Sequence, residues 1–236
     1  LLATISSGTE TSTVSSLTNG STYYYRISAN DNAGNESSKT SDVTSMPHVT
    51  DGDYSLSFDG SNDYIEISPA SELVAANNTV SIGSWVKVPT SNNKANPTIV
   101  GARSSYGYLL YAGSTSHSGA ARFDINTASD SFSNIVGTSD LRDNNWHYVV
   151  ATYDGTTMKL YVDGSLERSS DVSTTYLAGL SGNQNMNFGT GNHASEYFIG
   201  NIDEVAIWND ALTAAEITAL YNSGNPLAAS SNSGNY

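Results

Sequence analysis

Apolar and polar residues alternate in short runs along most of this 236-residue chain, a pattern typical of strands that bury one face. In 80–88, for example, Val80, Ile82 and Val86 fall on one side and Trp85 falls on the other. Similar runs predict further strands at 11–17, 23–29, 38–43, 54–58, 64–67, 98–103, 106–112, 121–126, 146–153, 158–162 and 198–208. The chain is therefore predicted to consist mainly of short strands.

Turn and cap signals refine this prediction. Asp-Gly pairs at 154–155 and 163–164 follow strand-like runs and predict tight hairpins. One helix is expected near the C-terminal end, because Thr213 and Glu216 have the spacing of a capping box and Gly224 ends the segment. Many short antiparallel strands with one terminal helix predict two packed sheets.

The pattern changes near Pro47, which predicts a domain boundary at that point. We expect a first domain at 1–47, a linker at 48–53 and a larger domain at 54–226. The small, polar residues 227–236 are expected to be a linker or the start of another module.

The segment LTNGSTYYYRISANDNAGNESSKTSDVTSMP, residues 17–47, resembles the end of a fibronectin type III domain. Leu17 and Tyr23 match that family's tyrosine corner, in which the tyrosine hydroxyl bonds to upstream backbone. The resemblance implies a partial immunoglobulin-like β-sandwich, since the first strands of such a domain are not in this sequence.

Four stretches of the larger domain carry a second resemblance. They are LSFDGSNDYIEI, SIGSWVK, NNWHYVVATYDGTTMKLYVDG and FIGNIDEVAIWNDALTAAEITALYNSG. Together they are similar to a laminin G-like (concanavalin A-like lectin/glucanase) jelly-roll module. The resemblance implies an all-β, antiparallel two-sheet jelly-roll sandwich with one short C-terminal helix. Terminal strands of a jelly roll commonly pair, which would place 56–58 beside 202–207.

Composition excludes several function classes. The chain has 9 basic and 23 acidic residues, a formal net charge of −14, so a basic nucleic-acid-binding stripe is not expected. It contains no cysteine, which excludes disulfides, zinc–thiolate sites and a cysteine nucleophile. No run of 18 apolar residues is present, so we expect no membrane span in this segment.

Acidic residues suggest a metal site. Asp59 and Asp63 flank a Gly-Ser-Asn turn, and pairing of the terminal strands would bring Asp203 towards them. Calcium accepts such hard oxygen ligands, and the family resemblance supports a structural Ca²⁺ held by these three side chains. In the alternative, Asp59 and Asp63 only cap their own turn.

Catalytic machinery is not evident in the sequence. Jelly-roll hydrolases set two carboxyl groups on one strand face as E-x-D-x-x-E or E-x-D-x-E, and neither pattern occurs here. Adjacent strand residues such as Asp203 and Glu204 point to opposite faces. His147 alternates with Trp146 and Tyr148 without a nucleophile motif, so it is interpreted as structural. We therefore expect no enzyme.

Aromatic and polar residues suggest ligand contacts, because sugar rings stack on aromatic side chains and amides or acids bind their hydroxyls. The first candidate set is Arg103, Tyr106, Tyr108 and Tyr111, with Arg122 and Asp124 nearby. The second is Asn185, His193 and Tyr197, with Tyr176, Asn183 and Asn187 nearby. Tyrosine is also common on ordinary strands, and the three tryptophans at 85, 146 and 208 are expected in the core.

These observations favour a non-catalytic binding or adhesion module of a large, secreted or cell-surface bacterial protein, recognising glycans or surface proteins. One alternative is a structural repeat of an extracellular filament or stalk, with self-assembly by strand donation. Another is the accessory carbohydrate-binding domain of a polysaccharide-degrading enzyme. In each case neighbouring modules of the same polypeptide are expected partners, because the sequence opens at Leu1 rather than Met and reads as a piece of a longer product.

Overall fold

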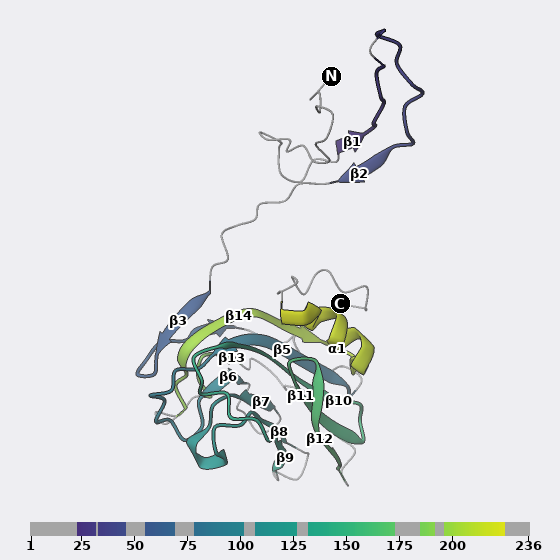
Figure 1. Cartoon of the computed structure of the whole chain (residues 1–236). Coiled ribbons are helices and arrows are strands. Elements are labelled where there is room, and N and C mark those ends of the chain that lie inside the picture. The colour runs from purple at the N-terminus through teal and green to yellow at the C-terminus, as the bar shows by residue number, and fades with distance from the viewer. Residues whose placement is uncertain are drawn as a thin grey trace. The chain divides into compact units, whose positions relative to one another are not determined.

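The computed structural model separates the chain into two compact units, Leu1–Tyr54 and Ser55–Tyr236 (Figure 1). Each unit is considered by itself. The structure describes residues 23–31, 33–45, 55–68, 78–101, 107–126, 132–172, 185–191 and 196–224. The predicted strand at 11–17 and the tail 227–236 lie outside these residues.

The first unit contains one two-stranded sheet among its described residues. β1 (Tyr23–Tyr25) pairs antiparallel with β2 (Val43–Ser45). β1 is shorter than the predicted 23–29, and β2 shares only Val43 with the predicted 38–43. Between the two strands a side-chain oxygen replaces part of the ladder, since the Ile27 amide donates to Thr40 Oγ1. Leu17 lies outside the described residues, so the tyrosine corner and the fibronectin type III resemblance stay predictions.

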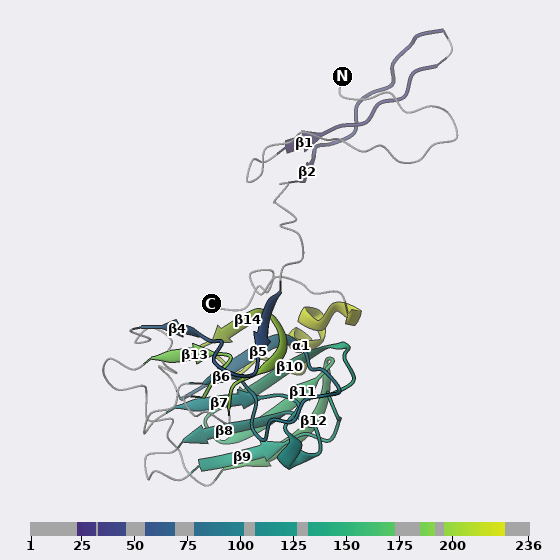
Figure 2. The ribbon, with the colours of Figure 1, turned by 90° about the vertical axis from the view of Figure 1, so that its left-hand side faces the viewer.

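The second unit is a sandwich of two antiparallel six-stranded sheets, as predicted (Figure 2). The first sheet has the order β12 (Ser165–Asp171), β11 (Thr157–Val162), β10 (Trp146–Tyr153), β5 (Val80–Lys87), β14 (Ile199–Trp208) and β3 (Leu56–Asp59). The second has the order β4 (Ile65–Ile67), β13 (Met186–Phe188), β6 (Thr98–Gly101), β7 (Tyr108–Tyr111), β8 (Arg122–Asn126) and β9 (Phe132–Val136).

The terminal strands of this unit pair, as the jelly-roll resemblance implied. β14 is antiparallel to β3, with Ile199 opposite Asp59 and Ile202 opposite Leu56. The contact is shifted relative to the expected one, because the later part of β14 pairs only with β5. A β-bulge between Asp203 and Ala206 interrupts that second pairing.

Alternation in the strands builds the core between the sheets. In β5, Val80, Ile82 and Val86 point inward and are at most 1% exposed. In β8, Phe123 and Ile125 meet them from the other sheet and are fully buried. Each such side chain contributes about 1.5–3 kcal/mol of transfer free energy.

A second apolar cluster lies on the outer face of the first sheet, beneath α1 (Ala214–Tyr221) (Figure 1). Ile217 and Leu220 of the helix cover Trp85 and Trp208 of the strands. The helix begins with the predicted capping box at Thr213. None of the helices within the described ranges is long and apolar enough to cross a membrane.

Trp146 is an exception to the expectation that all three tryptophans are buried. It pairs with Lys87 at the end of both strands and is 38% exposed. Tyr148, the next residue of β10 on the same side, already packs in the cluster beneath α1. The expectation of a core position was therefore wrong for Trp146, because it lies on the outer face beyond this cluster.

Candidate ligand-binding face

Both sides of β7 are buried, although only one side faces the core. Tyr108 and Leu110 point between the two sheets, so Leu109 and Tyr111 point outward from the second sheet. Leu109 is nevertheless 0% and Tyr111 2% exposed. Other residues therefore cover Leu109 and Tyr111 on this outer side, and polar side chains take part in that cover.

The structure corrects the interpretation of Tyr108 as a ligand contact. This side chain belongs to the core cluster, and burial raises the pKa of its hydroxyl. Strand alternation separates it from Tyr111, since residues at odd spacing lie on opposite faces. Of the two tyrosines of β7, only Tyr111 is part of the outer face.

Tyr111, Arg122 and Asp124 form a connected cluster on this outer face. Tyr111 lies opposite Arg122 in the ladder, and the Tyr111 hydroxyl donates to Asp124 Oδ2 at 3.3 Å. Arg122 donates from Nε to Asp124 Oδ1 and from Nη2 to Asp124 Oδ2, each at 2.6 Å. The Arg122 Cζ atom lies 5.3 Å from the centroid of the Tyr111 ring, within the range of a cation–π contact.

The members of this cluster differ in their access to solvent. The Asp124 side chain is only 4% exposed, whereas that of Arg122 is 20% exposed. A carboxylate with so little access to water needs a close cation and hydrogen-bond donors, and Arg122 and Tyr111 supply both. The part of the pair that reaches solvent is therefore the guanidinium.

Two further polar side chains border the cluster. Asn134 of β9 lies opposite Asp124 and is exposed. His117, in the short 3₁₀ turn Thr115–His117, lies within electrostatic range of Arg122 and Asp124. Burial, followed by the positive charge of Arg122, lowers the pKa of His117. We call Tyr111, Arg122, Asp124 and Asn134 the β7–β9 face.

Residues 190–191 and 196–197, called the crossing loop below, include backbone that lies against β6 next to this face. The Thr98 amide donates to the Glu196 carbonyl at 3.0 Å. A β-carbon on Gly101 would lie 2.9 Å from the Thr190 carbonyl oxygen and 3.1 Å from Gly191 Cα, so glycine permits this close approach. The polar residues that become buried under or within the loop are Thr98, Asn187, Thr190 and Glu196.

The remaining sequence candidates fall into two groups. Asn185 precedes β13, and Tyr197 lies in the crossing loop between Glu196 and Phe198; both are half-buried. The others lie outside the described residues: Arg103, Tyr106, His193, Tyr176 and Asn183. Asn134 and Glu196 were missed, because β9 was not predicted and the crossing loop has no periodic pattern.

The structure does not bring the three proposed calcium ligands together. Asp59 lies opposite Ile199 at one end of β3, whereas Asp203 lies opposite Trp85 of β5, beyond the other end of β3. No cluster of three or more His, Asp or Glu side chains suited to a metal occurs within the described residues.

The two carboxylates of the β3–β4 turn instead cap its backbone. Asp59 Oδ1 accepts from the Ser61 amide at 2.7 Å, and Asp63 Oδ2 accepts from the Asp59 amide at 2.9 Å. A β-carbon on Gly60 would lie 2.9 Å from Lys94 Cε, so the cationic side chain of Lys94 also reaches this turn. These contacts match the turn-capping alternative, and a structural Ca²⁺ stays a prediction.

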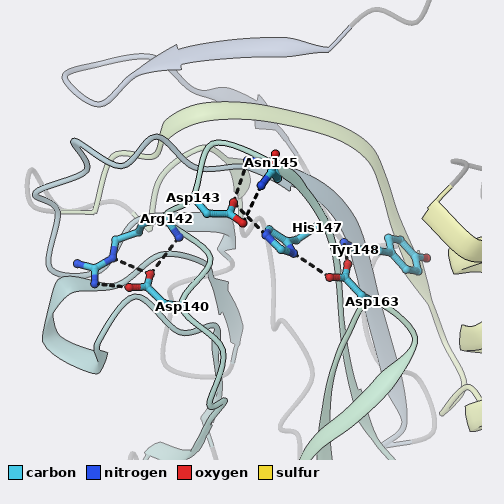
Figure 3. A network of polar contacts seen from close by, with 7 residues as sticks. All are labelled: Asp140, Arg142, Asp143, Asn145, His147, Tyr148 and Asp163. Carbon is cyan, nitrogen blue, oxygen red and sulfur yellow. Dashed lines mark hydrogen bonds and ion pairs between the residues drawn. The ribbon is translucent and has the colours of Figure 1, made fainter.

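His147, near the start of β10, occupies a polar network (Figure 3). Its Nδ1 lies 2.8 Å from Asp163 Oδ2, and its Nε2 lies 3.2 Å from Asp143 Oδ1. Asp163 Oδ1 also accepts from the Tyr148 amide at 2.9 Å. The hydrogen bond to Asp163 is the main cause that raises the pKa of His147.

This network has a structural role in the geometry shown. It ties the loop with Asp143 to β10 and to the turn between β11 and β12, where Asp163 adopts a φ of 50°. Both hydrogen bonds found for the imidazole go to carboxylates, so within the described residues no serine is in place as a nucleophile. The interpretation of His147 as structural agrees with these contacts.

Solved structures with the same fold include three binding domains. The binding domain of Paraclostridial Mosquitocidal Protein 1 is 17% identical, with a TM-score of 0.58 over 85% of this chain and 46% of that chain. The receptor-binding domain of botulinum neurotoxin D is 18% identical, with a TM-score of 0.56 over 72% of this chain and 44% of that chain. The chain thus spans less than half of the length of either toxin domain.

A third structure is similar over nearly its whole length. It is the CBM40 of the Ruminococcus gnavus IT-sialidase bound to α2,3-sialyllactose, 18% identical, with a TM-score of 0.53 over 68% of this chain and 97% of that chain. Identities this low show the fold alone. No curated protein matches the chain.

Sequence comparison identifies the family. A model of the laminin G-like group, described as the concanavalin A-like lectin/glucanases superfamily, matches residues 59–218, which is more than half of the chain. The match covers the strands of the two sheets apart from most of β3, and it covers most of α1. The protein therefore belongs to the concanavalin A-like lectin/glucanase superfamily.

Proposed function

We propose that the larger unit is a non-catalytic module that binds glycans or surface proteins outside the cell, and that the β7–β9 face is its ligand surface. The observation that carries this proposal is the buried, fully connected group of Tyr111, Arg122 and Asp124 on an outer sheet face. Outer sheet faces normally hold solvated polar side chains. A connected polar group at such a place is the arrangement that oriented recognition requires.

The fold relatives support this assignment. The two toxin domains are a binding domain and a receptor-binding domain, and the CBM40 is bound to a sugar. An extracellular place for this chain and membership in a larger adhesive protein are part of the same proposal. They rest on the resemblance to surface modules and on the strongly negative composition, which disfavours anionic polymers as partners.

The state of Asp124 favours binding over hydrolysis. Glycoside hydrolysis needs one carboxyl group that donates a proton and a second that acts as base or nucleophile. Both oxygens of Asp124 already accept hydrogen bonds from Arg122. A carboxylate held in this way orients its partner rather than exchanging protons with a substrate.

Binding of the intact chain to a printed glycan array, followed by titration of the best hit, tests the proposal. Asn134→Ala removes an exposed amide from the β7–β9 face and should weaken binding about tenfold. Asn209→Ala is the matched control, because Asn209 is also exposed but lies just after β14 in the first sheet. Equal loss in both variants, or binding that neither changes, would reject the proposed surface.

A further inference from the structure

We propose that the β7–β9 face selects uncharged, hydroxyl-rich glycans over acidic ones, and that Asp124 sets this preference by occupying the Arg122 guanidinium. This inference rests on the proposed function and adds the chemical class of the ligand. It makes Asp124 a specificity-determining residue that acts through Arg122.

The Arg122 donors that could bind a ligand carboxylate are already engaged by Asp124. A guanidinium recognises a carboxylate through two parallel N–H groups, and no other side chain does so as well. In Arg122 two such donors, Nε and Nη2, each lie 2.6 Å from an oxygen of Asp124. The pair of donors that the carboxylate of an acidic sugar needs is therefore already bonded to Asp124.

Displacement of Asp124 from Arg122 by a ligand carboxylate would be unfavourable. The Asp124 side chain is 4% exposed, so a ligand carboxylate that took over Arg122 would break a buried ion pair. Removing one partner from a buried ion pair is strongly unfavourable. The Tyr111 hydroxyl, which also donates to Asp124, cannot replace the lost positive charge.

The other ionisable side chains also disfavour an anionic ligand. Since the pKa of His117 is lowered from 6.5, this imidazole at the border of the face is neutral near pH 7 and adds no cation. Arg142, which follows the β9 strand in sequence, is likewise held by both oxygens of a neighbouring aspartate, Asp140. The whole chain carries a formal charge of −14, which further disfavours an anionic ligand.

The β7–β9 face still has polar groups that can bind ligand hydroxyls. Arg122 retains its Nη1 donors, its side chain is 20% exposed, and the exposed amide of Asn134 lies across the ladder from Asp124. These groups donate to and accept from hydroxyls without requiring a charge on the ligand. Likeness in fold to a module bound to sialyllactose, an acidic sugar, would suggest the opposite preference.

An array of neutral glycans printed beside their sialylated counterparts tests the inference. We expect the unchanged chain to bind neutral glycans and to lose binding where sialic acid has been added. Asp124→Asn should release the two Arg122 donors and strengthen binding to α2,3-sialyllactose about tenfold. Asp42→Asn is the matched control, because it breaks another two-pronged arginine–aspartate pair, with Arg26, in the first unit; no gain is expected there.

The outcomes separate the two proposals. Binding of sialylated glycans by the unchanged chain, or an Asp124→Asn variant that is folded by circular dichroism yet gains nothing, overturns the charge preference and leaves the binding function standing. Failure of the unchanged chain to bind any glycan overturns this inference and the glycan part of the proposed function, and leaves surface proteins as its ligands. If Asp124→Asn does not fold, the comparison of neutral and sialylated glycans with the unchanged chain still decides the inference.

Discussion

The imidazole of His147 lies between two carboxylates, 2.8 Å from Asp163 on the Nδ1 side and 3.2 Å from Asp143 on the Nε2 side (Figure 3). The two acids come from different connections, one before β10 and one between β11 and β12. Protonated His147 donates to both, so it links these connections. Its contribution to stability should therefore depend on pH.

The sign follows from the raised pKa of His147. A histidine whose pKa is higher in the folded than in the unfolded chain stabilises fully below the unfolded value of 6.5 and loses this contribution as pH rises through the folded value. We expect His147→Gln to cost about 1 kcal/mol of unfolding free energy at about pH 5.5 and less at about pH 8.5. Urea denaturation at the two pH values measures the difference.

His117→Gln serves as the control for this experiment, because the pKa of His117 is lowered rather than raised. Its pH dependence should have the opposite sign, with a stabilising effect of the substitution, if any, at the lower pH. A cost of His147→Gln that is the same at both pH values would contradict the proposed linkage.

The β3–β4 turn should be stabilised by Asp59 through its own backbone. Asp59→Ala removes the acceptor for the Ser61 amide and should lower the free energy of unfolding by about 1 kcal/mol. Thermal melts with excess chelator and with added Ca²⁺ should show the same cost. A transition of the unchanged chain that falls with chelator and recovers with Ca²⁺ would instead support the calcium prediction and require another ligand set.

The close packing of the crossing loop on β6 should depend on the absence of a β-carbon at Gly101. Gly101→Ala places a β-carbon 2.9 Å from the Thr190 carbonyl oxygen and 3.1 Å from Gly191 Cα, and these backbone atoms leave little room to relax. We expect a loss of about 1–3 kcal/mol, measured by denaturation, together with weaker glycan binding. Gly155→Ala is the control, because its nearest backbone atom is 3.6 Å away and only its positive φ of 94° opposes the substitution. Undiminished stability of Gly101→Ala would show that the loop does not press on β6.

Helix α1 should be held mainly by its buried face. Ile217→Ala removes a fully buried side chain that covers Trp85 and Trp208, and should cost about 2–4 kcal/mol. Thr218→Ala, at the neighbouring exposed position, should change stability by less than about 0.5 kcal/mol. Similar melting temperatures of the two variants would contradict this account.

Strands with one apolar face could be predicted from sequence, and strands without one could not. β5 and β10 were predicted nearly to the residue, because each alternates strongly and supplies the core. β12, with the sequence LERSSD after its first serine, is exposed at almost every position, so no pattern marks it. β13 has only three residues, too few for a period to be recognised.

The candidate site was predicted in part for similar reasons. Tyr111, Arg122 and Asp124 were singled out by residue type, and the ladder brings them together. Asp203 could not be placed, because its position depends on the register between β14 and its two neighbours and on a bulge. Glu196 approaches the outer face through a loop, which sequence periodicity does not describe.

Helix α1 has a consequence for how the domain meets other molecules. A sandwich of two similar sheets has two broad sides, and here the helix seals one of them with an apolar cluster (Figure 1). The domain thereby has one broad side that α1 covers and an opposite broad side, the polar outer face of the second sheet. Copies attached through the helix-covered side would all present the same polar surface outward, so avidity would come from neighbouring copies that lie side by side in one plane.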